Sequence, residues 1–256
     1  MRLLVAGPPG ASADLIARLL GEALGTELGQ VVNVEPRPGA AGLLAAGELI
    51  RAPHDGQTLL VGVNSLVSEI PHIVKSGHDL GRELRPLAEL ARGGLVLVGH
   101  PSLPARNLAE LVAWIKARPS QVSVASYSRG TMSHVLGRLF NQALGTNLQR
   151  VGYKGSTPRR MAVLPEVPTF TELGLPRLQA VGWMGLWCTP DLPAAAQARL
   201  RAATLKVLAQ PGLHERLLAL GFEAGTSRTP EEMGADLRAD FERVGAVLKS
   251  VGFKPD

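Results

Sequence analysis

The sequence predicts an α/β fold with two lobes, and two observations carry this prediction. Roughly the first sixty residues alternate in the order strand, helix, strand, helix, strand, which is typical of parallel strands joined by right-handed crossovers. A short strand, a turn of small residues and a helix start recur in the second half, which indicates a second lobe facing the first across a cleft. With 256 residues, the chain can bury the core of one large domain or of two modest ones.

Apolar periodicity locates the elements of the first half. The expected strands are 3–6, 31–35 and 58–63, and the expected helices begin after residue 11 and near residue 43. Residues 71–94 are less regular, and the run 95–99 predicts a further strand. Residues 100–104 are expected to cross between the lobes.

Helix-start signals organise the second half. Asn107 with Glu110 forms a capping box, and Thr229 is followed by proline at the first helical position and by Glu232 two residues later. The expected elements are helices over 108–117, 131–145, 193–208, 211–220 and 230–249, strands over 122–126 and 179–188, and a short strand and loop over 148–155.

The segment 7–14, which we call the 7–14 loop, is the main candidate for a binding site. It joins the first strand to the first helix, and open α/β sheets bind ligands at the carboxyl ends of their strands. Its small residues let a ligand approach unpaired helix amides, which favour a carboxylate or a phosphate. Asp14 would repel a bare anion, so a ligand that also carries a donor group is expected. The alternative is a tight turn in which Asp14 merely stabilises the helix.

Composition excludes several classes of protein. Apolar residues make up 45% and charged residues 19%, as in globular domains. We expect the formal charge of +5 to be spread along the chain and to favour small anionic ligands, whereas 4% aromatic residues offer few platforms for nucleic acid. The single cysteine, Cys188, excludes an intramolecular disulfide and is expected to be buried and inert. No bilayer-spanning stretch and no signal peptide are visible in this chain.

Seven short motifs occur in an order that resembles the Bug-type periplasmic solute-binding proteins, the receptors of tripartite tricarboxylate transporters. The matching segments are residues 8–10 with Asp14, 34–40, 53–60, 128–134, 153–155, 165–169 and 254–256. Each motif alone is weak, but seven in this order across nearly the whole chain are specific.

The resemblance implies a Venus-flytrap fold that closes on a small carboxylated molecule and delivers it to a membrane permease without chemistry. Lobe 1 would comprise 1–99 plus 189–256, and lobe 2 would comprise 100–188. A periplasmic location follows, with no cofactor, metal or catalytic residue, and we expect a monomer. The ligand itself stays open among dicarboxylates, aromatic acids and amino acids.

In such proteins, backbone amides, hydroxyl groups and ordered waters hold the carboxylate between two facing loops. Carried over by position, the ligand-binding residues are Pro9, Gly10, Ala11, Ser12 and Asp14, with Asn64 and Ser65 behind them, and Ser128, Gly130, Thr131, His134 and Tyr153 from the other lobe.

The sequence departs from the family pattern in two places. Ala11 stands where a second glycine is usual, which makes the loop less permissive. Between Thr157 and Met161, on the order of 40–50 residues are missing, at least one crossover unit of the second lobe. Their loss predicts an exposed apolar patch where the missing strands would pack.

Three functions compete. The first is a receptor for a small carboxylate with a shortened second lobe, and the second is a truncated remnant of such a receptor that binds nothing tightly. The third is an α/β enzyme that handles a phosphate or nucleotide through the 7–14 loop. Against the enzyme, no Lys-Ser/Thr follows the glycine as a P-loop requires, and no dinucleotide fingerprint or Gly-x-Ser-x-Gly elbow is present.

Overall fold

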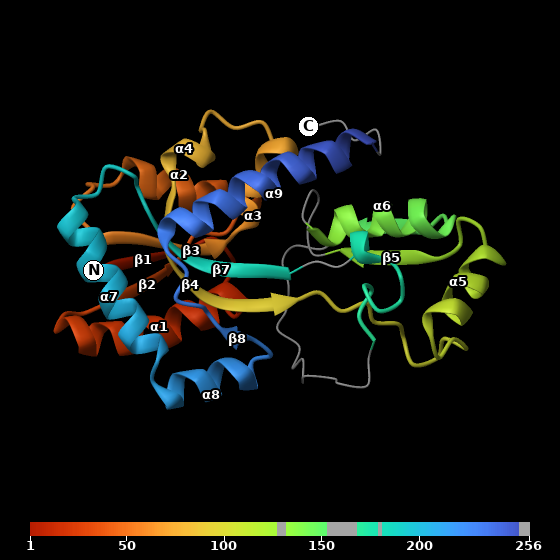
Figure 1. Ribbon diagram of the computed structural model, residues 1–256, viewed down its shortest axis with the longest axis horizontal. Helices are drawn as coiled ribbons and strands as arrows, with labels where there is room; N and C mark the ends of the chain where they lie inside the picture. Colours follow the sequence, from red (N-terminus) through yellow and green to blue (C-terminus); the bar gives the residue numbers. More distant parts are fainter. Residues whose placement is uncertain (127–131, 153–167, 179–180, 251–256) are drawn as a thin grey trace.

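A computed structural model describes residues 1–126, 132–152, 168–178 and 181–250. In these residues a six-stranded sheet and a two-stranded sheet form two lobes side by side (Figure 1). We call the six-stranded sheet with its helices the large lobe, and the two-stranded sheet with helices α5 and α6 the small lobe.

The large sheet is mixed. Its strands are β1 Arg2–Val5, β2 Asn33–Pro36, β3 Thr58–Val63, β4 Arg85–Gly94, β7 Val181–Cys188 and β8 Glu223–Ala224, in the order β2-β1-β3-β7-β4-β8. β1 lies parallel between β2 and β3, as the strand–helix pattern predicted. β7 runs antiparallel between β3 and β4.

Helices cover both faces of this sheet. They are α1 Ser12–Leu28, α2 Leu43–Arg51, α3 Ser65–Ser68, α4 Leu80–Glu83, α7 Ala194–Leu208, α8 Pro211–Ala219 and α9 Pro230–Ser250, with short 3-10 turns at Ala40–Gly42 and Ile70–His72. The predicted start of α9 is confirmed, because the Glu232 carboxylate accepts the Thr229 amide at 2.7 Å and the Thr229 hydroxyl accepts the Glu232 amide at 3.2 Å.

Two predictions about strands were wrong. The strand expected at 95–99 lies earlier, at Arg85–Gly94, because pairing with β7 continues only as far as Gly94 opposite Val181. The strand Val181–Cys188, which the predicted bounds assign to lobe 2, belongs to the large sheet, where β3 and β4 pair with it on either side. The other limits of the predicted lobes stay a prediction.

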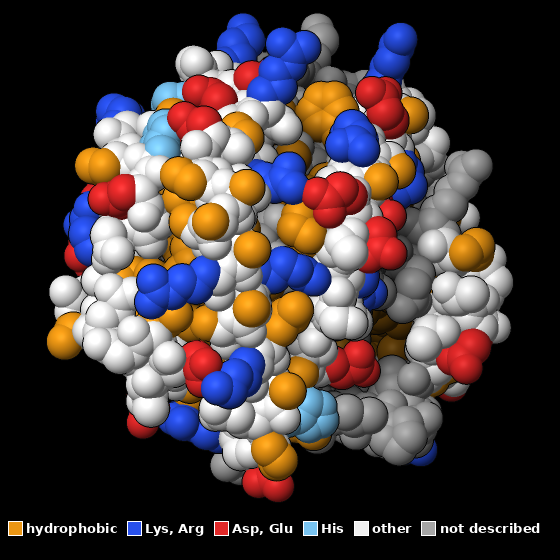
Figure 2. Space-filling view, turned by 60° about the vertical axis from the view of Figure 1, so that its left-hand side comes forward, with side chains coloured by type: hydrophobic (Ala, Val, Ile, Leu, Met, Phe, Trp, Pro, Cys, Tyr) orange, Lys and Arg blue, Asp and Glu red, His pale blue; other side chains and the backbone are white. Residues whose placement is uncertain are grey.

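Ion pairs lie at several places on the surface of the large lobe. Figure 2 shows basic and acidic side chains interspersed on the face that this lobe presents. One ring lies across the first strands, where Arg2 and Arg37 each contact both Glu35 and Glu48 at 2.5–2.8 Å. These side chains are 25–39% exposed, so the ring stabilises the strand ends only modestly.

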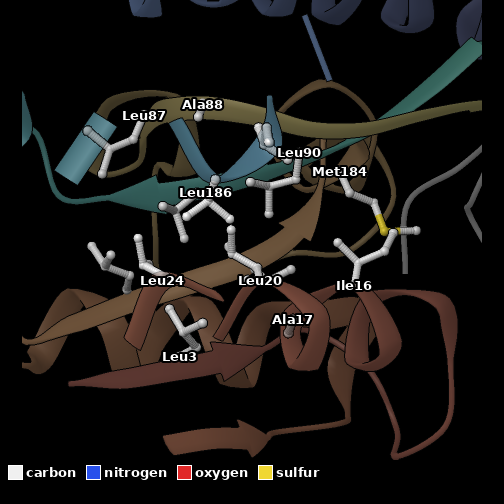
Figure 3. Packing of buried hydrophobic residues seen from close by; sticks show 14 of the residues in the cluster. Leu3, Ile16, Ala17, Leu20, Leu24, Leu87, Ala88, Leu90, Met184 and Leu186 are labelled. Carbon is white, nitrogen blue, oxygen red and sulfur yellow. The ribbon is translucent and has the colours of Figure 1, made fainter. Parts of the chain in front are cut away.

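The core of the large lobe has two layers, one on each face of the sheet. Leu3 and Val5 point toward α1, α7 and α8, where they pack with Leu20 and Leu186 (Figure 3). Leu4 points the other way, toward a layer formed by α2, α3 and α9. Because adjacent strand residues face opposite sides, continuous apolar runs such as β1 are what a doubly covered sheet needs.

The small lobe is built on a short parallel pair. Its elements are α5 Leu108–Lys116, β5 Ser123–Ser126, α6 Met132–Leu144, β6 Gln149–Gly152 and a 3-10 turn at Pro176–Leu178. Its own core centres on Ile115, Phe140 and Leu178. A separate apolar cluster joins Val135 of α6 to Val244 and Leu248 of α9, so that α6 also packs against the large lobe.

Among the described residues, none of the helices combines the length and the apolar character needed to cross a bilayer.

Candidate functional site

The 7–14 loop leaves the carboxyl end of β1 and presents the start of α1. Gly10 adopts a φ of 76°, a left-handed conformation that favours glycine. The residue that precedes α1, Ala11, has no side chain able to cap it, so the first helix amides are left for solvent or a ligand. Pro9 and Gly10 are exposed and Ser12 is half-buried, whereas Ala11 is buried. This is an open helix N-terminus of the kind that attracts anions.

The buried carboxylate of Asp14 holds the 7–14 loop in its conformation through a hydrogen bond to the loop backbone. Its side chain is only 2% exposed, and its Oδ2 accepts the Gly10 amide at 2.9 Å and the Arg18 Nε at 3.0 Å. The ion pair with Asp14 raises the pKa of Arg18 and offsets the negative charge of the carboxylate. The repulsion of a ligand carboxylate that Asp14 alone would cause is therefore reduced. Its Oδ1 is buried and makes no hydrogen bond to the described residues.

Asn64 and Ser65 lie at the same sheet edge as the 7–14 loop. β1 and β3 are parallel neighbours with Val5 opposite Val61, so the chain leaves both strands on one side. Asn64 is 6% exposed. Its backbone amide donates to the Trp183 carbonyl of β7 at 2.9 Å, and its side-chain oxygen accepts the Trp183 amide at 3.2 Å. The Asn64 side-chain oxygen thus fixes β7 beside β3, while half-buried Ser65 begins α3.

The small lobe contributes one described residue of the predicted set. His134 lies in the first turn of α6, is 5% exposed, and its Nε2 accepts the Arg138 Nε at 3.3 Å. Ser128, Gly130, Thr131 and Tyr153 lie outside the described residues. The structure therefore brings the 7–14 loop and residues 64–65 together, whereas a shared site with the second lobe stays a prediction.

The sequence did not single out Ser126 and Arg150, whose polar side chains contact each other in the small lobe. Ser126 ends β5, is 3% exposed, and its hydroxyl accepts the Arg150 Nη1 at 3.2 Å. The sequence contained a signal for Ser126, because a polar residue at the end of a predicted strand is a candidate for ligand binding, as Asn64 is after β3. Arg150 gave no local signal, since only the pairing of β5 with β6 brings its side chain to that edge.

Cys188 is not a nucleophile. Its side chain is 1% exposed at the end of β7, and burial raises the pKa of the thiol to about 12. The described residues also contain no group of three or more His, Cys, Asp or Glu side chains placed to hold a metal ion. The geometry of these residues offers a binding surface at the 7–14 loop, built of backbone amides and small side chains.

Comparison with known proteins agrees with this geometry. Residues 16–159, more than half of the chain, match the family model described as the tripartite tricarboxylate transporter family receptor. The chain belongs to this family. It is the family that the seven motifs pointed to, and its members are receptors rather than enzymes.

Relatives of this receptor family align over nearly the whole chain. A protein encoded in the ttuE-ttuC' intergenic region of Agrobacterium vitis is 28% identical, with 98% of this chain and 84% of the relative covered. The protein BugT of Bordetella pertussis is 27% identical, with 99% and 90% covered. The BugT alignment is 299 positions long and this chain has 256 residues, so the relative contains residues that this chain lacks.

Solved structures confirm the two-lobed periplasmic-binding-protein fold. An R. palustris protein solved with adipate has a TM-score of 0.91 at 23% identity, and a periplasmic transporter has a TM-score of 0.90 at 28% identity. Each comparison covers 100% of this chain and 98% of the other chain. A receptor of the tripartite tricarboxylate family thus keeps the fold with a shortened chain.

Proposed function

We propose that this receptor captures a small carboxylated molecule between its two lobes, outside the cytoplasmic membrane, and passes it to the permease of a tripartite transporter. It performs no chemistry on the ligand and acts as a monomer. In this proposal the 7–14 loop binds one carboxylate at Ser12 and the first amides of α1, beside Gly10 and Ala11, whose own amides already donate to the Asp14 carboxylate and the Pro8 carbonyl. The second lobe closes on the ligand with His134 and with Ser128, Gly130, Thr131 and Tyr153.

The observation that carries this proposal is the construction of the 7–14 loop. An uncapped helix start, a left-handed glycine and a carboxylate neutralised by Arg18 together offer backbone donors without a competing anion. The adipate found in the R. palustris structure supports a dicarboxylate as the first ligand to try.

A truncated remnant is the second candidate, and a specific observation favours it. In the described residues, the small lobe has a two-stranded sheet where the large lobe has six strands. A receptor that lacks part of its second lobe would close incompletely and bind weakly.

A thermal-shift screen against small carboxylic acids tests the proposal. A ligand that binds only the folded state raises the free energy of unfolding in proportion to the logarithm of its excess over Kd, by about 2.7 kcal/mol at a hundredfold excess. The melting temperature rises accordingly. We expect a shift with one chemical group of acids, dicarboxylates first. The absence of any shift across dicarboxylates, aromatic acids and amino acids would favour the remnant.

Replacing Asp14 separates loop bracing from ligand contact. Because Asp14 Oδ2 is occupied by Gly10 and Arg18, D14A should release the loop and weaken every ligand that binds at this loop by a similar factor, about tenfold or 1.4 kcal/mol. D79N, which changes an exposed carboxylate elsewhere in the large lobe, is the control and should leave affinity unchanged. A loss confined to amino acids, measured by isothermal titration calorimetry, would instead mean that Asp14 Oδ1 meets the ligand's ammonium group.

A further inference from the structure

A second pocket lies in the small lobe, apart from the 7–14 loop. It has a volume of about 600 Å³ and is bounded by α6, by β5 and β6, and by Ser250 at the end of α9. This volume suits a small organic molecule. None of its described lining residues comes from the 7–14 loop or from residues 64–65, and His134 is the one described residue that the pocket shares with the predicted ligand set.

The side chains that line this pocket are polar and basic. Arg138 and Arg150 contribute positive charge, the His134 ring also lines the pocket, and none of the described lining residues is acidic. Within the described residues, Arg150 has no carboxylate partner, and its one hydrogen bond goes to the Ser126 hydroxyl at 3.2 Å. Arg2 and Arg37 of the large lobe, by contrast, each contact two carboxylates. The other N–H groups of Arg150 are therefore not committed to an acid.

One wall of the pocket is fixed before any ligand arrives. The Asn141 side-chain oxygen accepts the Leu148 amide at 2.9 Å and the Thr146 hydroxyl at 2.8 Å, while its amide group donates to the Leu148 carbonyl at 3.1 Å. These bonds tie the end of α6 to the start of β6, and the bond from Arg150 ties β6 to β5. Pre-ordered walls reduce the entropy that binding must overcome.

The positive charge of the chain is concentrated in the part of the sequence that contains the small lobe. Residues 95–180 contain ten Lys or Arg and three Asp or Glu, a net charge of +7, whereas the rest of the chain has a net charge of −2. The expectation that the positive excess is spread along the chain was therefore wrong. A region of one sign attracts small ions of the opposite sign and raises their local concentration.

We infer that the small-lobe pocket is a second binding site, which takes a small organic anion with two or more carboxylates and holds it through Arg150. The pocket volume, the basic lining without a described acid, the fixed wall and the local charge all point to this ligand class. The inference does not depend on ligand binding at the 7–14 loop, because no residue of that loop lines the pocket. Among the described residues, His134 belongs both to the pocket and to the ligand set of the proposed function.

Citrate is the probe, titrated into the full chain by isothermal titration calorimetry at low and at moderate salt. R150Q removes the donor that the site depends on, and R106Q is the matched control, since it makes the same charge change at an exposed residue of the same lobe outside the pocket. We expect a binding event that R150Q weakens at least about tenfold and R106Q less than about threefold, and that added salt weakens. D14A should leave this event unchanged.

Three results would overturn the inference. Equal losses in R150Q and R106Q would mean a diffuse field rather than a site. A citrate event lost in both D14A and R150Q would mean one site shared between the lobes. No citrate binding to the wild-type chain, while another acid binds in a manner sensitive to D14A, would leave the receptor function intact and eliminate the second site.

Discussion

The two lobes contain the same unit in different surroundings. In each, a short strand, a helix and a second parallel strand follow one another, as β1–α1–β2 and as β5–α6–β6. The residues Leu3, Leu4 and Val5 of β1 are all 0% exposed. In β5, Ser123 and Ala125 are exposed and Val124 is half-buried.

The difference comes from the neighbours of each strand. β1 has a strand on both sides and helices on both faces, whereas β5 pairs only with β6 in the part of the chain that the structure describes. Val151 of β6 is 43% exposed on the face that it shares with Ala125. A unit of local structure thus becomes a core only when distant segments cover it.

The segment after β4 shows the same effect. Leu95, Val96 and Leu97 are 38–42% exposed and Val98 is 74% exposed, although the run has the composition of a buried strand. It begins where the pairing of β4 with β7 ends. This exposed apolar run lies where the chain leaves the large sheet, whereas the patch expected beside the missing segment of the second lobe stays a prediction.

The largest effect should appear in native-state hydrogen exchange. Amides of β5 should exchange at least about a thousandfold faster than those of β1, because a two-stranded sheet opens without disrupting a large core. Mass spectrometry of peptides covering 2–5 and 123–126 measures both in one sample. Similar protection in the two strands would break the comparison between the lobes.

Truncating core side chains compares the two lobes by the free energy of unfolding that each strand contributes. L4A removes a fully buried side chain in β1 and should lower the free energy of unfolding by about 3–5 kcal/mol. V124A in β5 should cost less than about 1 kcal/mol, because Val124 is only half-buried. Chemical denaturation of both variants checks this, and equal costs would mean that β5 is buried as deeply as β1.

Replacing a buried and an exposed carboxylate should give a smaller difference in the free energy of unfolding between the lobes. Glu89 of β4 is 0% exposed and forms two hydrogen bonds to Arg92, at 2.7 and 3.0 Å. E89Q should cost about 2 kcal/mol, because Arg92 loses its partner but stays partly in solvent. E110Q in the small lobe, where Glu110 caps α5 from solvent, should cost less than about 1 kcal/mol. A larger loss in E110Q than in E89Q would contradict this order.

The smallest effect is a pH dependence confined to the large lobe. His54 donates to the Ile50 carbonyl at 3.0 Å and to the Asp191 carboxylate at 2.5 Å, which requires both ring nitrogens to be protonated. These bonds raise the pKa of His54 above its ordinary 6.5, and the bond from His54 lowers the pKa of Asp191 below its ordinary 3.8. The pair therefore stabilises the fold most between about pH 4 and 6.5 and loses its effect as the pH rises through the pKa of His54.

H54Q tests this pair. The variant should remove a small part of the fall in melting temperature from pH 6 to pH 8, no more than about 2 °C, because both side chains are partly exposed. H214Q, at a histidine of α8 remote from this pair, is the control and should keep the wild-type pH profile. A wild-type profile in H54Q would show that the ion pair contributes nothing measurable.

The sequence by itself determined the local structure and the family. The capping residues Asn107 and Thr229 marked where α5 and α9 begin, because a cap acts within one helical turn. The apolar runs of β1 and β3 and the helix between them predicted the parallel unit that presents the 7–14 loop. The order of seven motifs identified the receptor family, which the family model then confirmed.

Only the tertiary structure decided which sheet β7 joins, that Arg18 neutralises Asp14, and that Arg150 reaches Ser126. Strand pairing depends on contacts between residues far apart in the chain. An apolar run therefore indicates that a strand is buried, but it does not indicate which strand pairs with it. The charge of a binding loop likewise depends on which side chains fold against it. The composition of the chain set its total charge, and the order of residues in the sequence placed the positive part of that charge within residues 95–180.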